Sequence, residues 1–341
     1  MNTADFFYDL PEQAIAQTPV EPRHAARMLD TRDMSDRVFA DFPSMLKPGD
    51  LVVVNRTKVR AARLGGAKVE SGGAVEVLLL APLAEYRWEV LVRPARRIRA
   101  GLQLKLPGRL EAVVIDSPVE GRCTIEFVGD NRGDVESLVE EHGEVPLPPY
   151  IRSTLTEPDR YQTVFAGPVG SAAAPTAGLH FSEGVLDELE RLEIGLASVD
   201  LRVGLDTFRP ISTPQIEDHR MHSERVTVPR ETCEAIRDTH GRGGRVVAIG
   251  TTVVRSLESA VDEDGQIQPF DGSTRLFINP GYEFRAIDGV VTNFHVPGST
   301  LVVLIAAILG ERWRNVYQVG IERGYRFLSF GDAMFAEVER R

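Results

Sequence analysis

The chain has 341 residues, a mass of 37.6 kDa and a formal net charge of −11 at pH 7. Hydrophobic residues make up 43% of it and charged residues 26%, a mix typical of a globular protein of about two or three domains. This composition excludes a disordered chain, a fibre and a small disulfide-stabilised scaffold.

The cysteines and the apolar runs indicate a reducing compartment without a membrane anchor. Cys123 and Cys233 form no CxxC pair, so neither a thiolate zinc site nor a disulfide framework is expected. Residues 1–10 lack the basic and apolar regions of a signal peptide. The longest apolar run, Leu301–Leu309, is too short to span a bilayer, which requires about 20 residues. We therefore expect a cytoplasmic protein.

Residues 62–143 predict a small antiparallel sheet or barrel, because short β-rich runs recur at even spacing with Gly, Pro and Asp between them. The expected strands are Val75–Leu80, Trp88–Val92, Leu110–Ile115 and Cys123–Val128, with a helix over Asp134–His142. The proline-rich segment Pro146–Tyr150 marks the end of this block.

Strands and helices alternate in the rest of the chain, which predicts a mostly parallel sheet flanked by helices. The expected strands are Leu51–Val54, Ala197–Leu201 and Arg245–Ile249, and the expected helices are 183–192 after a Ser182 cap, 229–239, 253–260 and 301–309. The fold class is therefore α/β, with residues 1–61 and 149–341 forming one discontinuous domain and residues 62–148 inserted as a small antiparallel β-barrel domain.

Standard cofactor fingerprints are missing. The sequence contains no GxGxxG after a strand, no GxxxxGK[ST], no HExxH and no GxSxG. A standard dinucleotide fold, a P-loop NTPase, a zincin and an α/β-hydrolase are all disfavoured.

The segment Arg245–Arg255 predicts a buried strand that runs through a glycine turn into a helix. Free N–H groups at such a helix start suit an anion or a ligand carboxylate, and Arg255 would face the same pocket one turn later. An ordinary strand–helix turn with a threonine cap fits the same residues, and both interpretations stay open.

Small residues fill Ser171–Phe181, which ends in His180. Small side chains let the backbone approach a ligand closely, and a histidine is suited to acid–base work near neutral pH. A tight backbone crossing in the core, with His180 hydrogen-bonded there, explains the segment equally well.

Two further segments carry histidines. The spacing His219-x-x-His222-x-Glu224 is not that of a standard metal site, so acid–base work or a surface strand is favoured over metal binding. Asn293 and His295 precede the buried helix that Ser299 or Thr300 caps. Ligands of α/β sheets bind at such strand–helix junctions, although plain loop packing is the alternative.

Basic residues are concentrated in two tracts that contain no acid, Asn55–Lys68 and Arg93–Arg109. Of the 39 basic residues only four are lysines, which reflects either a GC-rich genome or selection for bidentate phosphate contacts. A solvated face explains the tracts as well, but in an acidic protein they favour nucleic-acid binding.

Taken together, these segments resemble the S-adenosylmethionine:tRNA ribosyltransferase-isomerase family from end to end. The matching segments are Phe7–Pro11 with Ile15-Ala16, Pro48–Leu51 with Asn55–Thr57, Pro146–Ile151, Arg160–Val164, Ala174–Phe181, Met221–Glu224, Gly250–Thr252 with Arg255, Phe277-Ile278 with Pro280–Tyr282, Thr292–His295, and Tyr325–Phe327 with Gly331–Met334. Asp206 stands where the family usually has glycine, and Gly298 where it commonly has a charged residue.

The resemblance implies an α/β domain with an inserted β-barrel and a transferase without a metal or redox cofactor. S-adenosylmethionine serves as ribosyl donor, and the acceptor is 7-aminomethyl-7-deazaguanine at the wobble position of tRNA. The products are epoxyqueuosine-tRNA, adenine and methionine. A tRNA methyltransferase and a non-catalytic RNA-binding relative are the alternatives, and we expect a monomer.

The resemblance, together with the two basic tracts for tRNA, gives three sets of site residues. The pool for proton transfer is His180, His222, Glu224, His295 and Asp332. The substrate-binding set is Pro175, Thr176, Ala177, Gly178, Gly250, Thr251, Thr252, Arg255, Asn293 and Arg326, of which Arg255 and Arg326 would hold the methionine carboxylate. The tRNA-binding set is Arg56, Lys58, Arg93, Arg96, Arg97 and Arg99.

Overall fold

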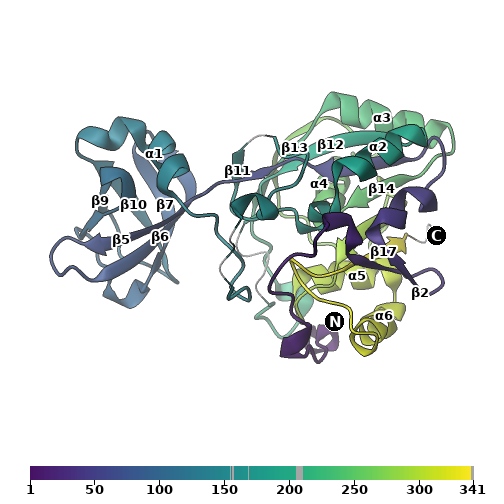
Figure 1. Ribbon diagram of the computed structural model, residues 1–341, viewed down its shortest axis with the longest axis horizontal. Coiled ribbons are helices and arrows are strands. Elements are labelled where there is room, and N and C mark those ends of the chain that lie inside the picture. The colour runs from purple at the N-terminus through teal and green to yellow at the C-terminus, as the bar shows by residue number, and fades with distance from the viewer. Residues whose placement is uncertain (154, 156, 168, 205–209, 339–341) are drawn as a thin grey trace. The chain divides into compact units, whose positions relative to one another are not determined.

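The computed structural model describes residues 1–153, 155, 157–167, 169–204 and 210–338. They form two compact units, Met1–Lys58 with Pro148–Arg341, and Val59–Leu147 (Figure 1). The boundaries expected from the sequence, 61/62 and 148/149, lie close to these limits. The α/β class with an inserted barrel is confirmed.

The first unit is built on a sheet of nine described strands. Their spatial order is β15 (Phe270–Thr274), β13 (Glu224–Val228), β12 (Gly195–Leu201), β3 (Leu51–Asn55), β14 (Val246–Ile249), β16 (Gly289–Asn293), β17 (Ala333–Glu337), β1 (Arg27–Asp30) and β2 (Ser35–Val38). The central strands β12, β3, β14 and β16 pair in parallel, as do β17 and β1. The pairs β1–β2, β12–β13, β13–β15 and β16–β17 are antiparallel, so the sheet is more mixed than the sequence suggested.

Burial on both faces explains the continuous apolar run of the central strand. Leu51 and Val53 belong to the core on one face, together with α3 (Arg230–Gly241), α4 (Thr251–Ser259) and α5 (Thr300–Leu309). Val52 and Val54 belong to the core on the other face, together with α2 (Glu183–Arg191). Side chains of a strand alternate between faces, and here both faces are apolar because helices cover both.

The remaining described elements are one helix, a two-stranded sheet whose first strand runs into the second unit, and 3-10 helices. They are α6 (Arg312–Glu322), the strands β4 (Lys58–Val59) and β11 (Val169–Ser171), and the 3-10 helices η1 (Thr3–Phe6), η2 (Glu12–Ala14), η3 (Arg23–Ala25), η4 (Phe39–Met45), η8 (Pro158–Tyr161), η9 (Thr176–His180) and η11 (Ile216–Asp218).

A side-chain cap is present at one of the three helix starts where the sequence offered one. Ser299 caps α5 as expected, because its side chain accepts a hydrogen bond from the Val302 N–H. Ser182 precedes α2, but its hydroxyl bonds the His24 ring at 2.8 Å instead of the helix backbone. The cap of α4 is Gly250, with a φ of 91°, and not a threonine.

The second unit is a closed antiparallel barrel with the strand order β10-β7-β6-β5-β8-β9. The strands are β5 (Arg63–Lys68), β6 (Ala74–Ala84), β7 (Arg87–Arg93), β8 (Gln103–Lys105), β9 (Glu111–Val114) and β10 (Arg122–Val128), joined by η5 (Ala95–Arg97) and η6 (Pro107–Arg109), with η7 (Asp130–Asp134) and α1 (Val135–His142) after them.

The barrel strands β5 and β8 were not predicted from the sequence. Gly65-Gly66 in β5 resembles a turn, but a Cβ at Gly66 would lie 2.4 Å from the Lys105 carbonyl oxygen. Glycine is therefore required there by the close approach of the neighbouring chain.

None of the described helices has both the length and the apolar character needed to cross a membrane.

Candidate active site

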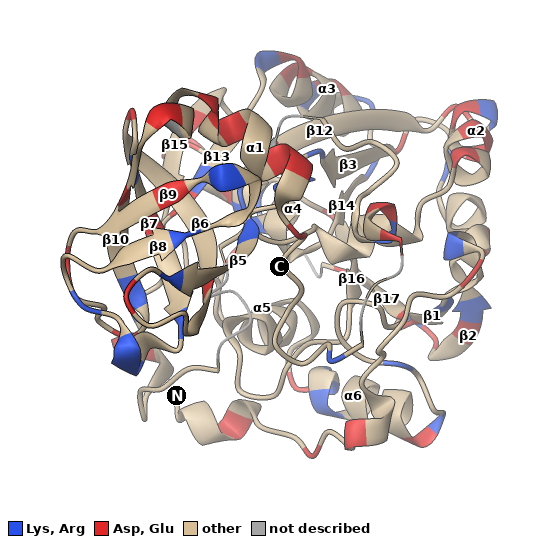
Figure 2. Ribbon diagram, turned by 60° about the vertical axis from the view of Figure 1, so that its left-hand side comes forward, with Lys and Arg blue, Asp and Glu red and all other residues tan. Residues whose placement is uncertain are grey.

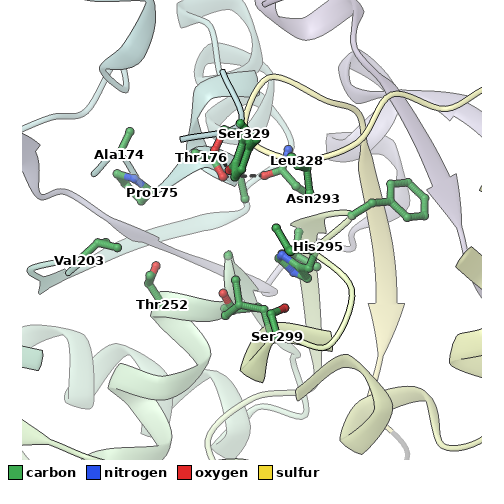
Figure 3. A pocket seen from close by; sticks show the side chains of 18 residues that line it. Ala174, Pro175, Thr176, Val203, Thr252, Asn293, His295, Ser299, Leu328 and Ser329 are labelled. Atoms are coloured by element: carbon green, nitrogen blue, oxygen red, sulfur yellow. Dashed lines mark hydrogen bonds between the residues drawn. The ribbon is translucent and has the colours of Figure 1, made fainter. Parts of the chain in front are cut away.

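A cavity lies at the carboxyl ends of the parallel strands β14 and β16, the place where α/β sheets bind ligands. It encloses about 560 Å³ of empty space, a figure that includes volume open to solvent. Most of its walls come from residues 174–177, 250–252, 292–296 and 328–329, and single residues complete them: Tyr150, Val203, Ser299 and Leu301. Figure 3 shows the polar side chains that face it, and we call it the central cavity.

Thr251 and Thr252 enter the central cavity because of the turn at Gly250. The φ of 91° at Gly250 is rarely adopted by other residues, and it starts α4 directly at the cavity wall. Asn55, at the end of β3, stabilises this turn through two contacts of its side chain. Its side-chain amide nitrogen lies 3.0 Å from the Leu201 carbonyl oxygen and 3.4 Å from the Thr252 hydroxyl.

Asn293 connects the central cavity to His180 behind it. The Asn293 side-chain oxygen accepts a hydrogen bond from the Thr176 hydroxyl at 3.0 Å (Figure 3). Its amide nitrogen lies 3.3 Å from His180 Nε2. An amide nitrogen only donates, so His180 Nε2 is the acceptor in this assignment and the ring proton is on Nδ1.

His295 is the member of the proton-transfer pool that lines the central cavity. Its Nε2 lies 3.0 Å from the Thr292 hydroxyl, its carbonyl oxygen accepts from the Tyr8 hydroxyl, and its N–H donates to the Tyr317 hydroxyl. Burial lowers the pKa of His295 to about 3, because the charged form loses its hydration. The ring is therefore neutral near pH 7.

His180 does not line the central cavity. It lies on a second cavity, together with Arg23, Arg160 and Arg326, which we call the arginine cavity. Burial and then the charge of Arg326 lower the pKa of His180 to about 4, so this ring is also neutral near pH 7.

The Asp332 carboxylate accepts hydrogen bonds from the backbone. It accepts hydrogen bonds from the N–H groups of Arg27 at 3.2 Å and Arg326 at 2.8 Å, and it also receives the Arg326 guanidinium at 3.4 Å. Asp332 is 2% exposed, so it holds the chain ends of β1 and β17 and positions Arg326.

His222, Glu224 and Arg255 form a separate cluster. Glu224 accepts from Arg255 Nη1 and lies 3.2 Å from His222 Nε2. Burial alone would raise the Glu224 pKa, but His222 and Arg255 outweigh it and lower that pKa to about 2. His222 and Arg255 line a third cavity, the Arg255 cavity, which shares the wall residue Leu301 with the central one.

This cluster corrects two expectations from the sequence. Arg255 does not line the central cavity beside the Gly250 turn, because its side chain turns to Glu224 and to the Leu276 carbonyl oxygen. Arg255 and Arg326 line different cavities, so they do not form a two-arginine carboxylate clamp.

Other members of the substrate-binding set divide between cavity and core. Pro175, Thr176 and Ala177 line the central cavity, as expected from the small-residue segment. Gly178 instead packs into the core, where a Cβ would lie 2.9 Å from Phe165 and Thr163. Asp206 lies outside the described residues.

The tRNA-binding set divides between the two units. Arg56 and Lys58 belong to the α/β unit, and Arg93, Arg96, Arg97 and Arg99 to the barrel unit. These four barrel arginines are exposed, and Arg99 contacts Glu70 at 3.2 Å. Figure 2 shows acidic residues on α1 and β9 of the same unit, so its surface is of mixed charge.

Sequence analysis missed the residues that hold the site together. Tyr8 and Tyr317 fix the backbone of His295, and Tyr150 bonds the Ser329 hydroxyl at 2.7 Å on the cavity wall. Tyr8 and Tyr150 lie in segments that carried the resemblance, which was the available signal. Tyr317 lies in α6 and has no such signal.

Comparison with known proteins identifies the family. The family model described as queuosine biosynthesis protein matches residues 3–336. The chain belongs to the queuosine biosynthesis protein family. It is therefore an enzyme of queuosine synthesis, as the resemblance of its motifs indicated.

Named relatives of this family match over nearly the whole chain. An S-adenosylmethionine:tRNA ribosyltransferase-isomerase from Heliobacterium modesticaldum is 48% identical over 98% of this chain and 99% of its own length. The protein of that name from Pelotomaculum thermopropionicum is 46% identical over the same shares. A crystal structure of S-adenosylmethionine tRNA ribosyltransferase from Thermotoga maritima matches with a TM-score of 0.54 and 34% identity, covering 97% of this chain and 99% of that one.

Proposed function

We propose that the central cavity is where the reaction of this queuosine biosynthesis family takes place on this chain. The ribosyl group of S-adenosylmethionine is transferred to the amine of 7-aminomethyl-7-deazaguanine at the tRNA wobble position and isomerised. Epoxyqueuosine-tRNA, adenine and methionine are the products. The supporting observation is that three family-like segments, Ala174–Phe181, Gly250–Thr252 and Thr292–His295, contribute the walls of one cavity.

The chemistry requires several proton transfers. The sulfonium acidifies the hydrogens on its 5′ carbon, so a base removes one, and adenine leaves more easily when its ring is protonated. The acceptor amine must also lose a proton, and a ribose oxygen then displaces methionine to close the epoxide. A group that accepts a proton and gives it up again therefore has to line the cavity.

We assign this proton carrier to His295. It lines the central cavity and is neutral near pH 7, so it offers an unprotonated ring nitrogen, although the same burial that lowers its pKa to about 3 weakens it as a base. The protonated ring would be a strong acid, which suits delivery of the proton to the departing adenine. The hydrogen bond to Thr292 and the two backbone contacts from Tyr8 and Tyr317 keep the ring at the cavity wall.

His180 acts as a positioning residue for Asn293. Its Nε2 accepts from the Asn293 amide, which fixes the Asn293 oxygen toward Thr176. Asn293 is 2% exposed and lines the cavity. Its amide nitrogen contacts His180 and also the Asp332 carbonyl oxygen at 3.5 Å, so its side-chain oxygen, which already accepts from Thr176, is the atom left to accept a hydrogen bond from a purine or deazapurine ring.

We place the methionine carboxylate of S-adenosylmethionine in the Arg255 cavity. Among the described residues Arg255 Nη2 has no hydrogen-bond partner, although it is buried. A buried donor without a partner is costly, and a carboxylate would satisfy it. Glu224 and His222 fix the guanidinium, and Leu301 separates this cavity from the central one.

The tRNA would contact the arginines of both units. The exposed residues Arg93, Arg96, Arg97 and Arg99 provide charge without sequence readout, as phosphate contacts do. Arg56 and Lys58 would provide further contacts on the α/β unit. The chain would act as a monomer in the cytoplasm, without a metal or redox cofactor.

Product analysis tests this function. The purified protein is incubated with S-adenosylmethionine and tRNA that carries the deazaguanine precursor, with and without EDTA. We expect free adenine and epoxyqueuosine by mass spectrometry, unchanged by the chelator. Methylated tRNA would indicate a methyltransferase, and tRNA binding without either product would indicate a non-catalytic relative.

A further inference from the structure

The arginine cavity is cationic and adjoins the central cavity. Arg23, Arg160 and Arg326 line it together with His180, and it holds about 280 Å³ of empty space that is partly open to solvent. Ser329 belongs to the walls of both cavities. The contact between Asn293 and His180 also joins them.

Backbone carbonyl groups hold these guanidinium groups in place. Arg23 donates to the Gln162 carbonyl oxygen at 2.6 Å and to that of Asp159 at 2.8 Å. Arg160 donates to the Val20 carbonyl oxygen at 2.8 Å, and Arg326 to that of Thr18 at 3.2 Å. Carbonyl oxygens orient a cation without neutralising it, so the positive charge remains.

Nearby carboxylates compensate this charge only in part. Arg160 contacts Glu21 at 2.8 Å, but the Glu21 side chain is 75% exposed, where an ion pair contributes little. Asp332 already accepts two backbone N–H groups besides Arg326. Burial, and next the charge of Arg160, lower the pKa of Arg23, and the carboxylates of Glu21 and Asp159 offset this only in part.

We propose that Arg23, Arg160 and Arg326 bind a phosphodiester group of the tRNA strand next to the modified nucleotide. This inference rests on the proposed function, because it takes the central cavity to hold the wobble base. A base that enters a pocket leaves the stack with its own phosphates on either side. A fixed cationic site beside the base cavity is where one of those phosphates must find a partner.

The charge of the other substrate argues against an alternative occupant. S-adenosylmethionine has one carboxylate, one ammonium and one sulfonium group, so its net charge is positive. Three arginines would repel such a molecule, whereas a phosphodiester carries only negative charge. The unpaired Nη2 of Arg255 offers the carboxylate a separate place.

The first test measures tRNA affinity against salt concentration, without S-adenosylmethionine, for the double variant Arg23→Gln/Arg160→Gln. We expect the Kd to rise about tenfold, and the slope of log K against log salt to fall by about 1, because one phosphate contact is lost. The matched control is Arg230→Gln. Arg230 is an arginine on α3 that is 77% exposed and lies outside the described cavities, so tRNA affinity and slope should stay unchanged.

The second test separates a phosphate site from a structural role. Arg23 and Arg160 each bond the opposite segment, so their loss could simply loosen residues 18–23 from residues 159–162. Arg23→Lys/Arg160→Lys keeps the charge but loses the bidentate bonds. We expect it to retain the wild-type salt slope. Equal losses of affinity in the lysine and glutamine variants, with an unchanged slope in both, would overturn the proposal.

Steady-state kinetics show whether the arginine cavity binds a tRNA phosphate or the carboxylate of S-adenosylmethionine. In the glutamine variant the KM for tRNA should rise while the KM for S-adenosylmethionine stays constant. The reverse pattern would show that the cavity takes the methionine carboxylate, and the phosphate site would be wrong. Absence of product from the wild-type protein would refute the proposed function, whereas the binding experiment would still decide on the phosphate site.

Discussion

The amide nitrogen of Asn293 lies 3.3 Å from Nε2 of His180, and this contact links the central cavity to the arginine cavity. Asn293 is also bonded to Thr176 on its other side. The two ends of this chain of three residues face different cavities, so a change at one is transmitted to the other through the orientation of a single amide.

This arrangement predicts different effects of the two buried histidines. His295→Gln removes the proposed proton carrier and should lower kcat by about 10²–10³-fold. His180→Gln retains an oxygen that can accept from Asn293, so kcat should fall less and its pH profile should keep the wild-type shape. His180→Ala should cost more than His180→Gln. Single-turnover rates over pH 5–9 provide the measurement, and a larger loss for His180→Gln than for His295→Gln would contradict the assignment.

Acid sensitivity follows from the same two rings. Both have a folded-state pKa below the usual value of about 6.5, at about 4 for His180 and about 3 for His295. Between the folded-state pKa of each ring and the usual value of about 6.5, the unfolded chain binds more protons than the folded one. Stability therefore falls as the pH drops below about 6.5. At pH 5 each histidine should cost about 2 kcal/mol relative to pH 7.

Urea unfolding of the wild type and of His295→Gln at pH 7 and pH 5 checks this expectation. The variant should lose less stability on acidification, by about 2 kcal/mol, because a glutamine does not titrate. An identical loss in both proteins would show that His295 is not held neutral by burial.

Much of this site could be anticipated from residues, and the rest depends on distances that sequence does not encode. The strand Leu51–Asn55 and the turn at Gly250 were predictable because a buried apolar run and a glycine each have a local cause. The contact of Arg255 with Glu224 could not be predicted, since Glu224 lies on β13, 31 positions earlier in the chain. The glycine pair in β5 resembles a turn in the sequence, whereas the structure requires Gly66 because the neighbouring strand approaches so closely.

The ion pair of Glu224 and Arg255 should dominate the stability of its region. Glu224→Gln leaves a buried guanidinium without its countercharge and should cost about 3–5 kcal/mol in the free energy of unfolding. The double variant Glu224→Gln/Arg255→Met removes both charges and should recover a large part of that loss. Urea denaturation measures both.

Substrate kinetics separate this structural effect from the proposed carboxylate contact. The double variant should show a raised KM for S-adenosylmethionine even though its stability is restored, because Arg255 Nη2 is gone. A normal KM in a stable double variant would remove Arg255 from the substrate site.

In this chain two separable features oppose a side chain at position 298, where the family commonly has a charged residue. Its φ is 68°, where residues with a side chain are strained, and a Cβ there would lie 2.3 Å from the ring of Phe7. Gly298→Ala should therefore destabilise the protein by about 1–3 kcal/mol, as backbone strain adds to overpacking.

Gly281→Ala is the matched control, since its φ is 99° but nothing lies within 4 Å of the Cβ position. It should cost only the backbone strain. The Phe7 ring is 52% exposed, so Phe7→Ala in the Gly298→Ala background should relieve the steric part and bring the loss down to that of Gly281→Ala. Thermal unfolding of the four proteins gives the comparison, and equal destabilisation by Gly298→Ala and Gly281→Ala would show that the Phe7 ring simply moves aside.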